Sequence, residues 1–258
     1  MSERPNIILT ESILSMLGEI ETVFKKNGVD YYFAGAFARD LHFSAKRIDK
    51  QFRRTNDIDI AICLNDEGQF QKIVRDLTST GSFVQIDNEP IKFIFKSQIE
   101  IDLIPFGKIE TENRETVLTK PMAFVLQMPG FSEAYQFIEE LKINGLVMKT
   151  CPLEGLVLLK LISHNDRSHR TKDITDIENI IDVYFDWNSE EIFSNHNDLF
   201  EEYDVKDLDF YLPMIAAHVI GRKMNKILEN STGLRKRIIS ILKKRDDPRW
   251  KAMKNAFI

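Results

Sequence analysis

Two aspartates separated by one residue, Asp57 and Asp59, lie in a run rich in β-branched residues that ends at Leu64. Side chains alternate between the two faces of a strand, so both carboxylates lie on one face, and Ile58 and Ile60 lie on the other. Two carboxylates this close repel each other, and a divalent cation between them removes that repulsion. The pattern indicates a metal site on a strand whose other face enters the core.

A second acidic pair, Glu100 and Asp102, repeats this alternation further along the chain. If the two strands are neighbours in one sheet, Asp102 joins Asp57 and Asp59. Three carboxylates can hold two Mg²⁺ ions about 3.5–4 Å apart, an arrangement used for phosphoryl transfer. A single Asp-x-Asp is more often a pair of solvent-facing acids, but two such pairs after a glycine turn favour a site.

That glycine turn joins Tyr31–Phe33, which reads as a short strand, to Gly35 and Ala36 at the start of a predicted helix. Backbone N–H groups at a helix N-terminus bind phosphate. Gly35 and Ala36 are therefore expected to seat the phosphates of a nucleotide.

Periodicity predicts the elements that position these residues. The expected helices are 10–27, 36–43, 69–79, 153–164, 171–185, 207–229 and 234–244, and the expected strands are 31–33, 57–64, 83–86, 91–95, 98–104, 135–143 and 146–150. The stretch 44–54 reads as a basic loop. We expect an α+β fold, with a mixed sheet flanked by helices in residues 1–150 and a helical domain in residues 151–258.

The composition is that of an ordinary globular protein, with 43% hydrophobic and 29% charged residues among 258. The two cysteines, Cys63 and Cys151, lie far apart in apolar surroundings and read as small core residues. The sequence shows no apolar run of membrane-spanning length and no signal-peptide pattern, so we expect a cytoplasmic protein with no membrane partner.

The net charge of −5 is unevenly distributed. From Thr232 onward, nine Lys or Arg face two Asp, so this segment carries +7 and the remainder −12. Such asymmetry is typical of a nucleic-acid surface, although a solvated amphipathic helix explains it equally well.

The strand, glycine turn, helix, Asp-x-Asp strand and later single aspartate resemble the polymerase-β-type nucleotidyltransferases, with Gly35, Asp57, Asp59 and Asp102 in the motif positions. Within that superfamily the chain is most similar to the AbiEii/AbiGii-type nucleotidyltransferases, some of which are toxins of toxin–antitoxin and phage-defence systems. The resemblance covers roughly residues 31–182 and implies Mg²⁺, an NTP such as ATP, and an antitoxin protein as a partner.

The resemblance extends to an apolar helix with a lysine, a basic loop and a helix that begins Lys-Asp-x-x-Asp. It implies that Lys160 contacts the triphosphate and that Asp173 is a general base or a partner of Lys160. It also makes Arg167, Arg170 and Lys172 candidate phosphate ligands. Each role has a structural alternative. The Lys160 amine can extend to solvent, Asp173 can simply interact favourably with the helix dipole, and the three loop cations can be solvated.

Two features depart from the superfamily pattern. Ala36 stands where Gly or Ser is usual, so a hydroxyl contact to phosphate is missing, and the basic loop lengthens the spacing to Asp57. Arg39 and Asp40 are similar to a run in tRNA nucleotidyltransferases and in some antibiotic nucleotidyltransferases, so Arg39 joins the candidate nucleotide ligands.

The sequence therefore predicts a metal-dependent nucleotidyltransferase that transfers NMP from an NTP to an acceptor hydroxyl. The first expected acceptor is RNA, such as a tRNA 3′ end. The alternatives are a small-molecule, antibiotic-type nucleotidyltransferase and a catalytically inactive binding module.

Overall fold

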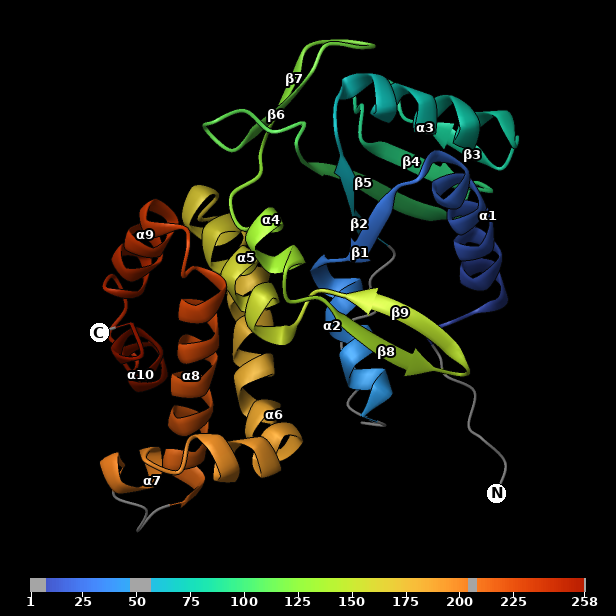
Figure 1. Ribbon diagram of the computed structural model, residues 1–258. Coiled ribbons are helices and arrows are strands. Elements are labelled where there is room, and N and C mark those ends of the chain that lie inside the picture. The colour runs from blue at the N-terminus through green and yellow to red at the C-terminus, as the bar shows by residue number, and fades with distance from the viewer. Residues whose placement is uncertain (1–7, 47–56, 204–207, 258) are drawn as a thin grey trace, which may run out of the picture. The chain divides into compact units, whose positions relative to one another are not determined.

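The computed structural model of the protein describes residues 8–46, 57–203 and 208–257 (Figure 1). The chain divides into two compact units, Met1–Cys151 and Pro152–Ile258. The first holds a mixed sheet flanked by helices and the second is helical, which confirms the predicted α+β class. Most of the predicted 44–54 loop lies outside the described residues, while Ser44 and Ala45 end a helix.

The first unit is built on a seven-stranded sheet in the order β3-β4-β5-β2-β1-β9-β8. The strands are β1 (Asp30–Phe33), β2 (Asp57–Leu64), β3 (Phe83–Gln85), β4 (Lys92–Phe95), β5 (Ile99–Gly107), β8 (Glu139–Ile143) and β9 (Leu146–Thr150). β2 pairs with β5, and β1 with β9, in parallel, and the other pairs are antiparallel. The two acid-bearing strands, β2 and β5, are therefore neighbours, which is the condition for bringing Asp102 near Asp57 and Asp59.

The helices of this unit are α1 (Glu11–Asn27), α2 (Gly35–Ala45), α3 (Glu67–Ser79) and the short α4 (Phe131–Tyr135). α1 begins where the Thr10 hydroxyl accepts a hydrogen bond from the Ile13 N–H at 3.3 Å, as a capping residue does. α1 and α3 pack on each other beside β3–β5 (Figure 1), and α2 contacts β2 and β8. These contacts place the start of α2 close to the acid-bearing strand.

One predicted strand begins too early, because Phe131–Tyr135 forms helix α4 and β8 starts only at Glu139. Gly130 has a φ of +99°, and the Glu133 carboxylate reaches back to accept from the Gly130 N–H at 3.1 Å. These contacts start a helical turn where the apolar pattern alone favours a strand. A separate two-stranded ribbon, β6 (Glu115–Leu118) and β7 (Phe124–Gln127), was not predicted.

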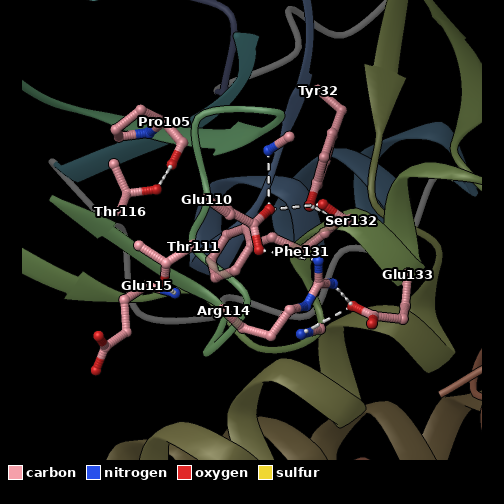
Figure 2. A network of polar contacts seen from close by, with 12 residues as sticks. Tyr32, Pro105, Glu110, Thr111, Arg114, Glu115, Thr116, Phe131, Ser132 and Glu133 are labelled. Atoms are coloured by element: carbon pink, nitrogen blue, oxygen red, sulfur yellow. Dashed lines mark hydrogen bonds and ion pairs between the residues drawn. The ribbon is translucent and has the colours of Figure 1, made fainter. Parts of the chain in front are cut away.

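A buried polar network fastens the segment after β5 to α4 (Figure 2). Glu110 accepts from the Gly107 N–H at 2.8 Å and from the Ser132 hydroxyl at 2.6 Å. Arg114 lies 3.0 Å from Glu110 and 2.5 Å from Glu133. The two carboxylates are almost fully buried, so the guanidinium between them offsets the cost of burying their charge.

The second unit consists of α5 (Leu153–Asp166), α6 (Thr171–Asn195), α7 (Leu199–Glu202), α8 (Leu208–Ile227), α9 (Thr232–Leu242) and α10 (Pro248–Asn255). α8 packs against α5, α6 and α10. A Cβ at Gly221 would lie 2.3 Å from the Met253 carbonyl oxygen, so this glycine allows α8 and α10 to pack closely. α6 extends ten residues beyond its predicted end, across a non-helical residue, Asn188, that interrupts the apolar period.

The two cysteines differ in their surroundings. Both are free; Cys151 is buried as expected, whereas Cys63 is partly exposed. Cys63 is an even number of residues from Asp59, so its side chain leaves β2 on the acid-bearing face and not on the core face. Across the described residues, no helix combines the length and apolarity needed to cross a membrane.

Candidate active site

The register of β2 and β5 aligns the acidic residues of the two strands. Asp57 pairs with Glu100 and Asp59 pairs with Asp102. Residues paired across neighbouring strands project from the same face, so all four acids lie on one face of the sheet. Ile58 and the other intervening residues of β2 are buried on the opposite face. Burial of these intervening residues in the core therefore directs the four acids to the other face of the sheet.

Gly35 brings the start of α2 against Asp59. Its φ is +62°, and a Cβ at this position would lie 1.8 Å from Asp59 Oδ2. The adjacent Ala34 N–H donates to the Asp59 carbonyl oxygen at 2.9 Å, which holds the two segments together. A glycine is required here both by the left-handed backbone and by the carboxylate. The Asp59 side chain therefore lies at the positively polarised end of a helix.

Asp102 carries the clearest electrostatic signature of the acidic face. Burial raises its pKa, and repulsion from the carboxylates of Asp59 and Asp57 raises it further, to about 7, although the ammonium of Lys92 lowers it. Simultaneous ionisation of these carboxylates is therefore unfavourable. A divalent cation would reverse this unfavourable balance by favouring the ionised carboxylates.

The chemistry of the donor set fits Mg²⁺, which binds carboxylate oxygens and keeps several waters. Asp59 and Asp102 share one register position, and Asp57 lies two residues away on the same face. Among the residues that the structure describes, no three Asp, Glu, His or Cys side chains converge closely enough to hold a metal ion by themselves. The structure thus places the predicted carboxylates on one face without drawing them into one coordination sphere.

The other residues predicted in the first unit lie along α2. Ala36 is the second residue of the helix and is partly exposed, so its N–H belongs to the first turn, whose N–H groups lack helical acceptors. Arg39 is buried and donates to Asp40 through Nε at 2.8 Å and through an Nη at 2.5 Å. Its guanidinium therefore has a carboxylate partner inside the protein.

A buried ion cluster joins α5 and α6 of the second unit. Lys160 Nζ lies 2.5 Å from Asp176 Oδ2 and 3.5 Å from Asp173 Oδ1. Arg170 Nε donates to Asp173 Oδ2 at 3.0 Å. Two cations and two carboxylates thus balance each other in a region where Lys160 and Asp173 are almost wholly buried. The structure makes Asp173 and Asp176 the partners of Lys160, one of the two roles expected for Asp173.

The remaining loop cations are more accessible. Arg167 is exposed at the C-terminal end of α5, and Lys172 is exposed in the first turn of α6. Exposed cations at a helix junction can bind phosphate oxygens without first breaking a buried ion pair. Of the predicted phosphate ligands in this unit, these two have the accessibility that the role requires.

The basic C-terminal segment makes many contacts within its own unit. Six of its nine cations have polar partners there: Arg235 with Asn225, Arg237 with Asp166, Lys244 with Asn165, Arg245 with His164, Arg249 with Asp247, and Lys251 with Asp246. Arg245 also lies 4.4 Å from the centre of the Trp250 ring. Charges held by these neighbours are less available to phosphates than the sequence suggests.

Lys92 also lies on the acidic face, although the motif pattern does not single it out. It pairs with Asp102 across antiparallel β4 and β5, so the two side chains share a face. The short turn 96–98 indicates the pairing of Lys92 with Asp102, because a tight hairpin fixes which residues of its two strands stand opposite each other.

No protein-family model and no curated protein matches the sequence. Among solved structures, the chain is similar to the solution structure of the antibiotic-resistance factor ANT(2'')-Ia, with 12% identity over 66% of this chain and 82% of that one, and a TM-score of 0.41. It is also similar to the crystal structure of ANT(2")-Ia in complex with adenylyl-2"-tobramycin (11% identity, 64% and 84%, TM-score 0.40).

A third similar structure is an antigenic nucleotidyltransferase-like protein from Paracoccidioides brasiliensis (18% identity, 79% of this chain and 94% of that one, TM-score 0.39). An assignment of activity to the present chain therefore rests on its own residues and geometry.

Proposed function

We propose that the protein is a metal-dependent nucleotidyltransferase that transfers NMP from an NTP to an acceptor hydroxyl. The observation that carries the proposal is the register of β2 and β5, which sets Asp59 beside Asp102 with Asp57 on the same face. Gly35 adds the start of a helix in direct contact with Asp59. Acids on one face next to a helix N-terminus provide the two functions that NTP–Mg²⁺ binding requires.

Each group in the first unit has a role in this proposal. Asp57, Asp59 and Asp102 would hold two Mg²⁺ ions, which supply Lewis-acid activation of the acceptor hydroxyl and charge stabilisation of the leaving pyrophosphate. The backbone N–H groups of Gly35 and Ala36 donate to phosphate oxygens and orient the nucleotide. Asp102 receives the proton of the acceptor hydroxyl as the oxygen attacks the α-phosphorus.

The second unit contributes cations to the same proposal. Arg167 and Lys172, both exposed, are the proposed ligands of the triphosphate. Arg170 and Lys160 orient the loop and the start of α6 through their ion pairs with Asp173 and Asp176. Lys160 would reach a phosphate only by exchanging a carboxylate partner for a phosphate oxygen.

RNA is the first proposed acceptor, in keeping with the resemblance to AbiEii/AbiGii-type toxins and with the excess of cations after Thr232. A toxin role would add an antitoxin protein as a partner.

One observation favours the second candidate, a small-molecule acceptor. Most of the C-terminal cations are engaged within their own unit, which reduces the charge available for a polyanion.

The decisive experiment incubates the protein with each labelled NTP, Mg²⁺ and either total RNA or a panel of aminoglycoside and lincosamide antibiotics. We expect label in RNA from one NTP, and label on an antibiotic instead would establish the second candidate. Asp57→Ala should abolish transfer, whereas Asp87→Ala, an exposed acid in a turn, should not. Nucleotide binding without transfer to either acceptor class would indicate a binding module and refute the proposal.

A further inference from the structure

One line of residues crosses three strands of the sheet at the acidic face. Asp59 of β2 pairs with Asp102 of β5, and Asp102 pairs in turn with Lys92 of β4. Paired residues project from the same face, with Cβ atoms about 4.5–5.5 Å apart. A cation is therefore built into the sheet directly beside one proposed metal ligand and two strands away from another.

The ammonium of Lys92 is held in this region by a short turn. Its Nζ lies 2.7 Å from Glu89 Oε2, and its backbone N–H donates to the Glu89 carbonyl oxygen at 2.9 Å. The side chain is 34% exposed, so its ammonium is more restricted than that of a fully solvated lysine. Lys92 is consequently a fixed feature of the acidic face.

The charges on this face affect one another in both directions. The hydrogen bond to Glu89 is the main reason that the pKa of Lys92 is raised, and attraction to Asp102 adds to it. Lys92 in turn opposes the rise in the pKa of Asp102. The ion pair with Glu89 and the pairing with Asp102 across the strands place the ammonium beside the carboxylates, where it repels a divalent cation.

We propose that Lys92 is an internal counter-cation that weakens the binding of free divalent metal at Asp59 and Asp102, so that metal binds tightly only together with the anionic triphosphate. This inference rests on the proposed function. Without nucleotide, the ammonium partly neutralises the acids and repels a metal ion. With NTP bound, four additional negative charges outweigh this repulsion. Lys92 thereby couples metal loading to nucleotide binding, as a positioning residue that need not touch substrate.

The test measures Mn²⁺ affinity by titration calorimetry and by the paramagnetic resonance of free Mn²⁺, for the full chain with and without a non-hydrolysable NTP analogue. Lys92→Met should bind free Mn²⁺ about three- to tenfold more tightly than the wild type, as expected for removing a unit charge several ångströms from a divalent ion. The difference should shrink when the analogue is present.

Two control variants separate this effect from a structural change. Lys92→Arg keeps the charge and should keep the wild-type affinity. Lys96→Met removes a lysine just beyond the end of β4, where its amine lies 3.5 Å from Glu19 on α1, and should leave Mn²⁺ binding unchanged. Thermal unfolding of all variants checks that each is folded.

The outcomes distinguish the inference from the function on which it rests. Wild-type binding of Mn²⁺ that depends on Asp57, with equal or weaker binding by Lys92→Met, overturns the role of Lys92 alone. Absence of Mn²⁺ binding in the wild type and in Lys92→Met, with and without the analogue, overturns both proposals. An equal gain in Lys96→Met would show a general charge effect and would also overturn the specific role.

Discussion

Gly35 and Asp59 are in such close contact that a single methyl group cannot be inserted between them. The ideal Cβ position of residue 35 lies 1.8 Å from Asp59 Oδ2, and the Gly35 backbone already has a φ of +62°. The contact joins the start of α2 to a proposed metal ligand. The backbone conformation at Gly35 therefore determines where the Asp59 carboxylate can lie.

Gly35→Ala should reduce kcat/KM for nucleotidyl transfer at least about 100-fold, because the new methyl group displaces the Asp59 carboxylate and misplaced catalytic groups cost about that much. The left-handed backbone adds about 1–2 kcal/mol of destabilisation. Gly28→Ala is a matched control, since Gly28 has a φ of +61° and nothing within 4 Å of its ideal Cβ position. Both variants should lose the stability that the left-handed backbone costs, but only Gly35→Ala should lose activity; equal activities would show that the contact with Asp59 is unimportant.

Replacement of Arg114 by Met should destabilise the first unit by about 2–3 kcal/mol. Glu110 and Glu133 have side chains only 2% and 11% exposed, so removing their shared guanidinium leaves two buried carboxylates without this cation. The figure is below that for a fully buried pair because Arg114 itself is 35% exposed. Urea unfolding measures the loss. Arg222→Met, which removes a partner of the 61%-exposed Asp198, should cost less than about 1 kcal/mol, and an equal cost would contradict this explanation.

Lys160→Met should destabilise the second unit by about 3–5 kcal/mol, because the largely buried carboxylates of Asp173 and Asp176 would lose the ammonium that they share. Adding Asp176→Asn to this variant should recover part of the loss, since one uncompensated charge is removed. Thermal and urea unfolding of the single and double variants test this coupling. Strictly additive effects would indicate that Lys160 and Asp176 do not interact energetically.

The carboxylate of Asp30 should make stability depend on pH in acid. Burial tends to raise its pKa, but hydrogen bonds from Lys149 and Tyr135, each at 2.6 Å, and from the Tyr31 N–H outweigh this and lower it. A lowered folded-state pKa stabilises the fold above the unfolded value of about 4, and this contribution is lost as pH falls through the folded pKa.

Urea unfolding of the wild type and Asp30→Asn should therefore show a difference in unfolding free energy at pH 7 that closes as the pH is lowered towards 2. A difference that stays constant over this range would mean that ionisation of Asp30 contributes nothing to stability.

Local periodicity was sufficient for most elements of the fold. The alternation of Asp57–Leu64 predicted β2 with the observed bounds, and Thr10 predicted the start of α1, because both signals depend on neighbouring residues alone. Short elements escaped prediction for the complementary reason. The β6–β7 ribbon forms by pairing between its two strands, and Glu133 of α4 is bonded to Arg114, 19 residues earlier, a contact that no local pattern records.

The sequence by itself determined which residues could do chemistry: two acidic pairs on strands, a glycine before a helix, and a lysine and an aspartate on two later helices. Only the tertiary structure decided how they combine. Strand register aligned Asp59 with Asp102 and placed Lys92 next to them, and helix packing engaged Lys160 with Asp176. The physical reason is that side-chain direction follows from backbone periodicity within a segment, whereas register and ion pairing depend on burial summed over distant segments.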